Sequence, residues 1–389
     1  MFRARILVTL IVVLSLFGCN SKTSISGILE HVETNTMVYI LQPQTLTDLA
    51  SPYLGKVVDS VKVNKDGHFS FQLTNDFSEK VLLELVVQSN GQPAQRLKNE
   101  NPLEANYMPL VWKPGDRLEL KANAQAFQKT CFIENPSEEN KALMQLRDVK
   151  MEAFIRFLKD KQWDVHEGMQ LLEKEHALLN YQKQLIAFAR ETLQPDAAMV
   201  AIRWVSPQND YERIPEFLVE QCAKWQDQAP EYPWVKELCK LADTSNLPVL
   251  VGDFFPDSLL PTVSGDTISI KEALGAKLTI VDIWASWCAP CRKENKVILD
   301  PLWKAYHDKG LQIIGYGLES DEQSWKAAIQ KDQALWLQTS HLEGDEAPFM
   351  QLLRIQMIPA NFILDAQGKV LTKNLHGEEL RQLVVERLE

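Results

Sequence analysis

Two cysteines stand three positions apart in the run Trp287-Cys288-Ala289-Pro290-Cys291. A C-x-x-C pair can occupy a single helical turn, which brings both sulfurs within reach of a disulfide bond. The run 278–284 just before it is apolar and β-branched, with the length of a buried strand. The two cysteines are therefore predicted to lie where a buried strand leads into a helix.

The predicted helix begins near Cys288. At a helix N-terminus the free N–H groups and the helix dipole favour an anion, which lowers the pKa of a thiol from about 8.5 towards roughly 7. Pro290 suits the first turn, because the N–H that it lacks would have no partner there. Cys291 lies about one turn further in and is expected to be less exposed. We therefore predict that Cys288 attacks a substrate disulfide and that Cys291 resolves the mixed disulfide.

Two other interpretations of the C-x-x-C pair are weaker. Half of a zinc site would need a second C-x-x-C or Cys/His pair at ligand spacing, and the sequence contains none. A purely structural disulfide is disfavoured, because a tight loop at the start of a helix is easily reduced. The pattern favours a redox-active dithiol that uses neither a metal nor a bound cofactor.

The run from Val281 to Cys291 closely resembles the active-site strand and motif of thioredoxins. More narrowly, it is similar to the membrane-tethered TlpA/ResA-like thiol-disulfide oxidoreductases. The resemblance extends from about Leu247 to Glu389, a little over a third of the chain. It implies an α/β thioredoxin-like C-terminal domain whose activity is thiol-disulfide exchange.

The resemblance also implies further site residues. Asp282 matches the buried acid beneath the cysteines, where burial would raise its pKa and let it accept the proton of Cys291. Ile358-Pro359 matches the cis-proline loop that faces the cysteines, where a substrate strand can pair with the exposed backbone. A trans proline on an edge strand is the alternative for Pro359.

Contacts with the substrate are assigned to the neighbours of these residues. The substrate-binding set consists of Trp287, Ala289, Pro290 and Ile358. The chain continues with Ala360-Asn361, where many relatives place a threonine after the proline. This difference bears on substrate preference and leaves the fold expectation unchanged.

The first residues have the pattern of an export signal. Arg3 and Arg5 precede an apolar stretch, 6–17, which is too short to span a bilayer but suits the core of a signal peptide. Residues 16–19 resemble the lipobox of bacterial lipoproteins, so Cys19 is the expected lipidation site. An ordinary cleaved signal peptide is the alternative. Either form predicts an exported protein, and lipidation would anchor it to the inner or outer membrane, facing the periplasm.

The remaining cysteines are Cys131, Cys222 and Cys239. Three is an odd number, so at least one of them stays free or pairs between chains. The sequence favours core packing for all three, since buried free cysteine behaves as a small hydrophobe. A bridge between Cys222 and Cys239 stays open in an oxidising compartment.

A length of 389 residues suggests two or three domains. The net charge of −11 argues against binding to nucleic acid. After the signal peptide (1–19), the pattern predicts an antiparallel β-sandwich-like domain over 25–123, a helical domain over 135–245 and the thioredoxin-like domain over 247–389.

Two local patterns make these expectations specific. Runs 57–63 and 68–73 alternate apolar and polar residues around Asp66-Gly67, which predicts a hairpin with one buried face. Asn135-Pro136 predicts the start of the first long helix, as an N-cap followed by proline.

Together these features predict a lipid-anchored thiol-disulfide oxidoreductase of the cell envelope. Its expected partners are disulfide-containing exported proteins, with apocytochrome c among the candidate substrates, a membrane dithiol that donates electrons, and the lipid bilayer through Cys19. The alternative is an envelope binding protein whose N-terminal half captures a partner, with the redox domain auxiliary.

Overall fold

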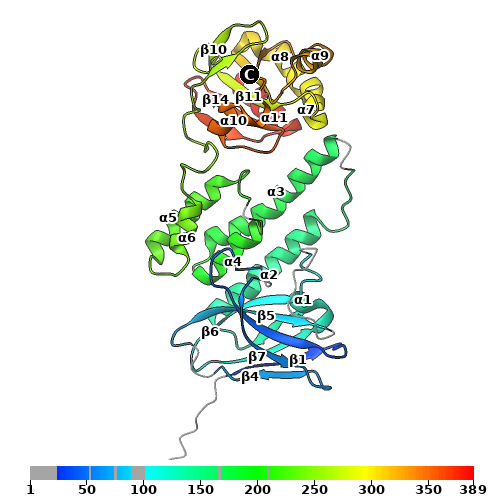
Figure 1. The fold of residues 1–389 in the computed structure, drawn as a ribbon, viewed down its shortest axis with the longest axis vertical. Coiled ribbons are helices and arrows are strands. Elements are labelled where there is room, and N and C mark those ends of the chain that lie inside the picture. The colour runs from blue at the N-terminus through cyan, green and yellow to red at the C-terminus, as the bar shows by residue number, and fades with distance from the viewer. Residues whose placement is uncertain (1–23, 52–53, 74–76, 90–100, 165–167, 209) are drawn as a thin grey trace, which may run out of the picture.

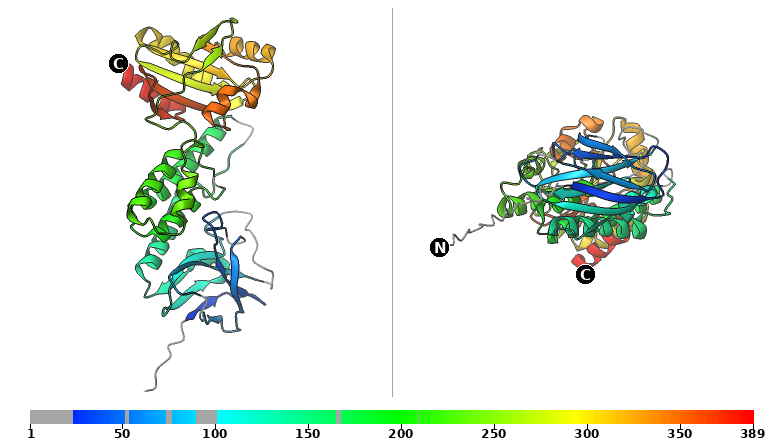
Figure 2. Two further views of the ribbon diagram at one scale, coloured as in Figure 1. Left: turned by 60° about the vertical axis from the view of Figure 1, so that its left-hand side comes forward. Right: turned by 90° about the horizontal axis from the view of Figure 1, so that it is seen from below.

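The computed structural model describes residues 24–51, 54–73, 77–89, 101–164, 168–208 and 210–389. The predicted signal peptide and Cys19 lie outside these residues. The molecule is elongated, with strands at one end, helices in the middle and an α/β domain at the other end (Figure 1). The two views of Figure 2 show the same order along the long axis.

Eight strands form two four-stranded sheets at the N-terminal end. They are β1 (Ser24–Glu30), β2 (Met37–Gln42), β3 (Lys56–Lys62), β4 (His68–Phe71), β5 (Val81–Gln88), β6 (Tyr107–Trp112), β7 (Arg117–Asn123) and β8 (Phe132–Glu134). One sheet has the order β4-β1-β7-β8 and the other β3-β2-β5-β6. The prediction of a wholly antiparallel domain is wrong at one place, since β1 and β7 pair in parallel from Ser24–Arg117 to Glu30–Asn123.

The predicted hairpin over residues 57–73 is also wrong. The turn exists, with the Gly67 N–H donating to the Asn64 carbonyl, but β3 pairs with β2 and β4 pairs with β1 in the other sheet. On β4 the alternation holds, because Phe69 and Phe71 are buried. On β3 it fails, because Val57 is 53% exposed. The turn at Asp66-Gly67 therefore connects strands of two different sheets and does not close a hairpin.

Five helices follow the sheets. They are α2 (Glu138–Phe157), α3 (Gly168–Glu191), α4 (Pro195–Val205), α5 (Pro215–Gln228) and α6 (Val235–Leu241), after the short α1 (Phe127–Thr130). The predicted N-cap at Asn135 is two residues too early. Ser137 is the cap, and its side chain accepts the Asn140 N–H, while Asn135 takes a left-handed φ of 48° in the turn before it.

The cysteines of this region differ from the expectation of core packing. Cys222 of α5 and Cys239 of α6 form a disulfide, with their Cα atoms 4.9 Å apart. Cys131 is free and buried, as expected for a small core residue, and burial raises the pKa of its thiol to about 12. The sequence left the bridge open because neither helix position could be related to the other in space.

The sheets and the helices share one core. A single cluster of buried apolar side chains runs from Ile25 to Leu247, and it includes residues of both sheets and of all five long helices. We refer to residues 24–247 as the N-terminal half. None of the helices that the structure describes has the length and apolar character needed to cross a membrane.

The C-terminal domain is built on a five-stranded sheet with the order β13-β12-β11-β14-β15. Its strands are β11 (Leu278–Trp284), β12 (Leu311–Gly317), β13 (Leu337–Thr339), β14 (Ala360–Asp365) and β15 (Val370–Lys373), preceded by the hairpin of β9 (Leu259–Pro261) and β10 (Thr267–Ser269). β12 and β13 are parallel to their neighbours, whereas β14 and β15 run antiparallel. This arrangement agrees with the expected thioredoxin-like fold.

Helices cover both faces of this sheet. α7 (Ala289–Glu294) continues through a π-helical turn (Asn295–Leu299) into α8 (Asp300–Tyr306), and α9 (Glu322–Asp332), α10 (Pro348–Leu353) and α11 (Gly377–Leu388) follow. Ile280 packs in a cluster with residues of α8 and α11, while Ile283 packs in a second cluster with residues of α10. The central strand β11 is buried along its whole length, so its C-terminal end is held rigidly.

Candidate active site

The cysteine pair lies at the C-terminal end of the central strand. β11 ends at Trp284, and α7 begins at Ala289 with Cys288 as its N-cap. Cys288 and Cys291 form a disulfide with their Cα atoms 5.3 Å apart. The Cys291 N–H points at the Cys288 sulfur at 3.3 Å. A reduced Cys288 would therefore face the unpaired N–H groups of a helix N-terminus, which stabilise a thiolate.

The neighbours of the pair divide into exposed and buried residues. The Trp287 side chain is 67% exposed, and Ala289 is exposed beside it. Pro290 is buried in the first turn of α7. Cys288 and Cys291 themselves are only 5% and 2% exposed. Trp287 and Ala289 thus offer an apolar surface next to a sulfur pair that is otherwise enclosed.

Asp282 lies inside the domain, on β11, and is 3% exposed. Its pKa is raised well above the ordinary value, mainly because burial disfavours the charged form and secondly because of the nearby Glu294 carboxylate. Asp282 and Cys291 belong to consecutive elements, β11 and α7. Both effects favour the protonated form of the carboxyl group, so Asp282 holds a proton more readily than an exposed aspartate does.

Two residues that the sequence reasoning missed stand next to this acid. Glu294 is 3% exposed, and its carboxylate accepts the Gly377 N–H at 3.0 Å and lies 2.8 Å from His376 Nδ1. Glu294 follows Cys291 by three residues, so helical spacing could have placed both on one face of α7. His376 precedes α11, far away in the sequence, and carried no local signal.

A second carboxylate holds the segment in front of the cysteines. Glu319 accepts the Ser286 N–H, and the Ser286 hydroxyl donates to it at 3.0 Å. Burial raises the pKa of Glu319 despite these hydrogen bonds. From the other side, Arg292 donates to the Ser286 carbonyl at 3.0 Å and pairs with the buried Asp332. Ser286 is thus fixed by both of its backbone groups, two residues before Cys288.

The proline loop, Gln356–Pro359, lies at the same edge of the sheet. β14 runs antiparallel to β11 with Ala360 opposite Ile283, so the residues before Ala360 are next to the end of β11 that leads to Cys288. The Ile358–Pro359 peptide bond is cis, as the resemblance implied. Ile358 packs against the apolar cluster that contains both cysteines.

Ala360 and Asn361, which follow the proline where many relatives place a threonine, are each 1% exposed. The Asn361 side chain donates to the Leu375 carbonyl at 2.5 Å and accepts the Leu375 N–H at 3.0 Å. Asn361 therefore fixes the segment that leads to His376. The link between Ala360-Asn361 and substrate preference stays a prediction.

The helices of the N-terminal half reach this site. α3 packs against α7, and Figure 1 shows its upper end beneath the domain that carries α7. At the side, His176 of α3 lies 3.3 Å from the Glu379 carboxylate of α11. The cysteine pair therefore lies close to the junction of the two halves.

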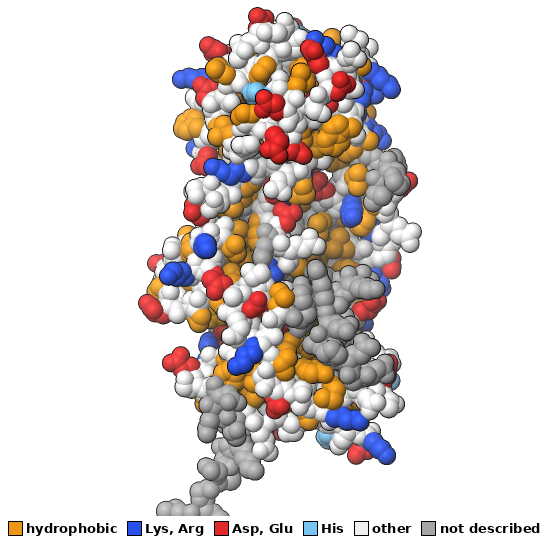
Figure 3. All heavy atoms as spheres, viewed as in Figure 1, with side chains coloured by type: hydrophobic (Ala, Val, Ile, Leu, Met, Phe, Trp, Pro, Cys, Tyr) orange, Lys and Arg blue, Asp and Glu red, His pale blue; other side chains and the backbone are white. Residues whose placement is uncertain are grey.

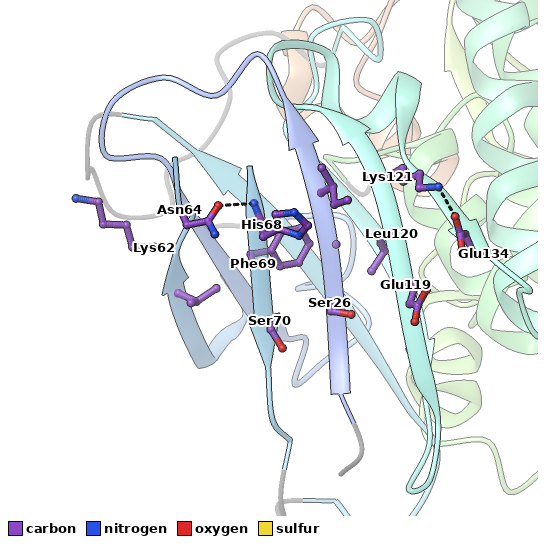
Figure 4. Close-up of a pocket in the computed structure, with 13 residues that line it drawn as sticks. Ser26, Lys62, Asn64, His68, Phe69, Ser70, Glu119, Leu120, Lys121 and Glu134 are labelled. Carbon is purple, nitrogen blue, oxygen red and sulfur yellow. Dashed lines mark hydrogen bonds and ion pairs between the residues drawn. The ribbon is translucent and has the colours of Figure 1, made fainter. Parts of the chain in front are cut away.

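A further hollow, of about 600 Å³, lies on the sheet β4-β1-β7-β8 at the opposite end of the molecule (Figure 4). His68 and Ser70 line one side and Glu119 lines the other, while Lys121 is paired with Glu134 (Figure 4). These side chains form no catalytic arrangement. Over the described residues, no three or more His, Cys, Asp or Glu side chains are grouped as metal ligands would be.

Comparisons with known proteins agree with this geometry. Residues 251–373 match the model of the AhpC/TSA family. The Thiol:disulfide interchange protein DsbE of Pseudomonas fluorescens biotype C is 30% identical over 138 residues, which cover 34% of this chain and 70% of the relative. The Thiol-disulfide oxidoreductase ResA of Bacillus thuringiensis subsp. konkukian is 25% identical over 138 residues, 36% of this chain and 76% of the relative.

Among solved structures, the thioredoxin domain of a thiol-disulfide oxidoreductase from Bacteroides vulgatus is 28% identical, with a TM-score of 0.34. The match covers 36% of this chain and 99% of that domain. The sheet, the cysteine pair and the sequence relatives define a thioredoxin-like redox domain. The chain belongs to the thiol-disulfide oxidoreductases with such a domain, and it is an oxidoreductase.

Proposed function

We propose that this protein reduces disulfide bonds in exported proteins through the Cys288/Cys291 dithiol. The observation that carries the proposal is the position of the pair. Cys288 is the N-cap of α7, at the end of the rigid strand β11, with Cys291 one turn further in. Neither a metal nor an organic cofactor is needed for this chemistry.

In the proposed reaction, the Cys288 thiolate attacks one sulfur of a substrate disulfide. A mixed disulfide forms and the other substrate sulfur leaves as a thiolate, which takes up a proton. Cys291 then loses its proton and attacks Cys288. The Cys288–Cys291 disulfide forms, the second substrate thiol leaves, and two electrons have passed from the enzyme to the substrate.

Asp282 is proposed as the acceptor of the Cys291 proton. A raised pKa matches this task, because a group that accepts a proton at neutral pH works best with a pKa near the working pH. Burial supplies that shift, and Glu294 adds to it. The role of Pro359 and Ile358 is to present backbone to the substrate beside the cysteines, with Trp287, Ala289 and Pro290 as the apolar contact.

The proposed location is the cell envelope, with the protein facing the periplasm and tethered to the inner or outer membrane by lipid on Cys19. The lipobox-like residues 16–19 support this location. A membrane dithiol would return electrons to the oxidised pair, and apocytochrome c is one candidate substrate. Cys19→Ala should prevent lipidation and release the protein from membranes. Equal membrane association and identical mature mass for the two proteins would rule out the lipid anchor.

The test of the reductase proposal is to trap thiols in living cells with acid and an alkylating reagent. A reductase should be found mainly as the Cys288/Cys291 dithiol, and Cys291→Ser should accumulate mixed disulfides between Cys288 and exported proteins. A pair found wholly oxidised, with no captured partners, would contradict the proposal. Cys222→Ser with Cys239→Ser serves as the matched control and should capture nothing.

The competing proposal is a binding protein whose N-terminal half captures an envelope partner. The hollow on the sheet β4-β1-β7-β8 favours it. On the face seen in Figure 3, basic side chains are scattered among acidic ones. Partners that remain bound when both Cys288 and Cys291 are replaced by serine would support this second function.

A further inference from the structure

The loop between α4 and α5, residues 210–214, meets the proline loop of the redox domain. The Glu212 carboxylate accepts two neighbouring backbone N–H groups, from Gln356 at 2.9 Å and from Met357 at 3.1 Å. Burial raises the pKa of Glu212, while these two amides and Arg213 lower it. Both carboxylate oxygens are thus used to hold a loop of the other half of the molecule.

Arg213, the next residue, binds the other end of the same loop. Its guanidinium donates to the Pro359 carbonyl at 2.9 Å and to Asn374 Oδ1 at 2.8 Å. Its Nε lies 2.8 Å from the Glu175 carboxylate of α3, and the side chain is only 9% exposed. Arg213 therefore joins α3, the proline loop and the segment after β15 through one planar group.

The two halves have separate apolar cores at this junction. The apolar cluster of the N-terminal half ends at Leu247, and the clusters of the redox domain begin at Phe255 and at Leu278. A hollow of about 470 Å³ lies directly beside the contact and is lined by Glu212, Gln356 and Arg354. Because side chains do not fill this hollow, the hydrogen bonds of Glu212 and Arg213 hold the loop beside it.

An ion pair between the two halves supports the same contact. Glu216, in the first turn of α5, lies 2.8 Å from Lys373 of β15 and accepts the Val251 N–H at 2.9 Å. The Lys373 side chain is 5% exposed and the Glu216 side chain is 34% exposed, so the pair is shielded from water on the lysine side. Charged groups with such fixed partners favour one arrangement of the two surfaces.

We propose that Glu212 and Arg213, the junction clamp, are positioning residues for thiol-disulfide exchange. They hold the backbone on both sides of Ile358 and so set how the proline loop is presented beside Cys288. The inference rests on the proposed role of the Cys288/Cys291 dithiol. It gives the N-terminal half a task in the reaction, through the position of the proline loop.

The junction clamp should affect substrates that bind the proline loop. It should not affect substrates that contact only the Cys288 sulfur. An extended peptide pairs its backbone with the loop, whereas a small aromatic disulfide reaches Cys288 without it. Misplacing a substrate-positioning group lowers reaction rates steeply, because the reacting atoms must be aligned. The clamp therefore predicts a selective loss that falls on peptide substrates.

The experiment compares full-length wild type, Arg213→Ala and Glu212→Gln, with dithiothreitol to regenerate the dithiol. We expect kcat/KM for a disulfide-containing peptide to fall about tenfold, mainly through KM, while the rate with a small aromatic disulfide stays unchanged. Arg190→Ala and Glu220→Gln are matched controls, because this exposed ion pair joins α3 to α5 at 2.8 Å without touching the redox domain. Both controls should behave as wild type.

Hydrogen exchange of the backbone amides gives a readout that does not depend on catalysis. Glu212→Gln should speed exchange at Gln356 and Met357 and leave strand β11 unchanged. If Arg213→Ala does not fold, Arg213→Lys takes its place, since one ammonium group cannot reach Pro359, Asn374 and Glu175 together.

Three results would overturn the clamp. They are an undiminished peptide rate in the variants, an equal loss with both kinds of disulfide, and unchanged exchange at Gln356 and Met357. A wild-type protein that reduces neither disulfide would instead contradict the proposed function. In that case the exchange measurement alone would decide whether the clamp holds the loop.

Discussion

Each half of the molecule contains one disulfide and one buried carboxylate on an inner strand. In the N-terminal half these are Cys222–Cys239 and Glu84 of β5. In the redox domain they are Cys288–Cys291 and Asp282 of β11. A disulfide and a buried carboxylate thus occur in both halves. Their surroundings distinguish the pair in the redox domain from the pair in the N-terminal half.

A redox-active disulfide would be expected to be the more exposed of the two, but the opposite is found. Cys288 and Cys291 are buried, whereas Cys222 and Cys239 are half-buried. The difference lies in the backbone. Cys288 caps a helix, where a thiolate is stabilised, whereas Cys222 lies within α5 and Cys239 within α6. A disulfide of 17-residue separation between two helices acts as a staple.

The two carboxylates differ in their neighbours. Glu84 accepts the Ala50 N–H at 2.6 Å, and burial raises its pKa to about 8 against the opposing effects of that bond and of Arg203. Asp282 has Glu294 as its charged neighbour, which raises the pKa further. Asp282 lies on β11, the strand that leads into α7 and its cysteine pair, whereas Glu84 lies on β5 of the N-terminal half. A raised pKa by itself therefore does not identify a catalytic acid.

The largest expected effect separates the two disulfides by activity. Cys288→Ser should reduce turnover of a disulfide peptide by at least about a thousandfold, because the attacking nucleophile is lost. Replacing both Cys222 and Cys239 by serine should leave turnover within about twofold, because α5 and α6 retain their packing. The measurement is steady-state reduction of the peptide. Comparable losses of turnover in the two variants would contradict the assignment of the chemistry to Cys288 and Cys291.

Asp282→Asn tests the carboxylate of the redox domain. The amide keeps the shape but cannot accept the Cys291 proton, so resolution should slow by about 100-fold while the first attack proceeds at a near wild-type rate. The mixed disulfide on Cys288 should then accumulate and be seen by acid quenching and mass spectrometry. An unchanged resolution rate in the folded variant would make Asp282 structural.

The Cys222–Cys239 disulfide should contribute to the free energy of unfolding. Loss of the Cys222–Cys239 bridge should lower the free energy of unfolding by about 3 kcal/mol, because the unfolded chain gains freedom. Denaturant unfolding of the double serine variant and of wild type measures this difference. Both proteins should be compared with Cys288 and Cys291 reduced and blocked. A difference close to zero would show that packing of α5 on α6 suffices.

The last prediction concerns the pH dependence of stability. Glu84 has a folded-state pKa raised from 4.5 to about 8, so its contribution is complete below the unfolded pKa and is lost as pH rises through the folded pKa. Between pH 4.5 and about 8, the free energy of unfolding of wild type should therefore fall relative to that of Glu84→Gln by about 1 kcal/mol per pH unit. Asp282→Asn should show the same sign, because its pKa is raised as well. Parallel stability curves for Glu84→Gln and wild type would refute the raised pKa.

Local patterns predicted the redox domain well. The strand at 278–284 and the helix start at Cys288 lie in adjacent elements, β11 and α7. Apolar run length and turn residues report such features directly. Glu294 was also within reach, since its spacing from Cys291 is helical.

Other features depend on distant parts of the chain. Lys62 and His68 are close in sequence but belong to strands of different sheets, and no local pattern records which partner a strand selects. His376 approaches Glu294 across 82 residues, and Arg213 approaches Pro359 across 146 residues. Such contacts are set by how the elements pack, so the sequence could not indicate them.

The central claim is that Cys288 attacks and Cys291 resolves. The most direct test mixes reduced full-length protein with a disulfide peptide, quenches with acid at successive times and maps the adduct by mass spectrometry. The account predicts a peptide adduct on Cys288 alone, which then gives way to the Cys288–Cys291 disulfide and free peptide thiols. An adduct that forms first on Cys291, or on Cys222 or Cys239, would contradict it.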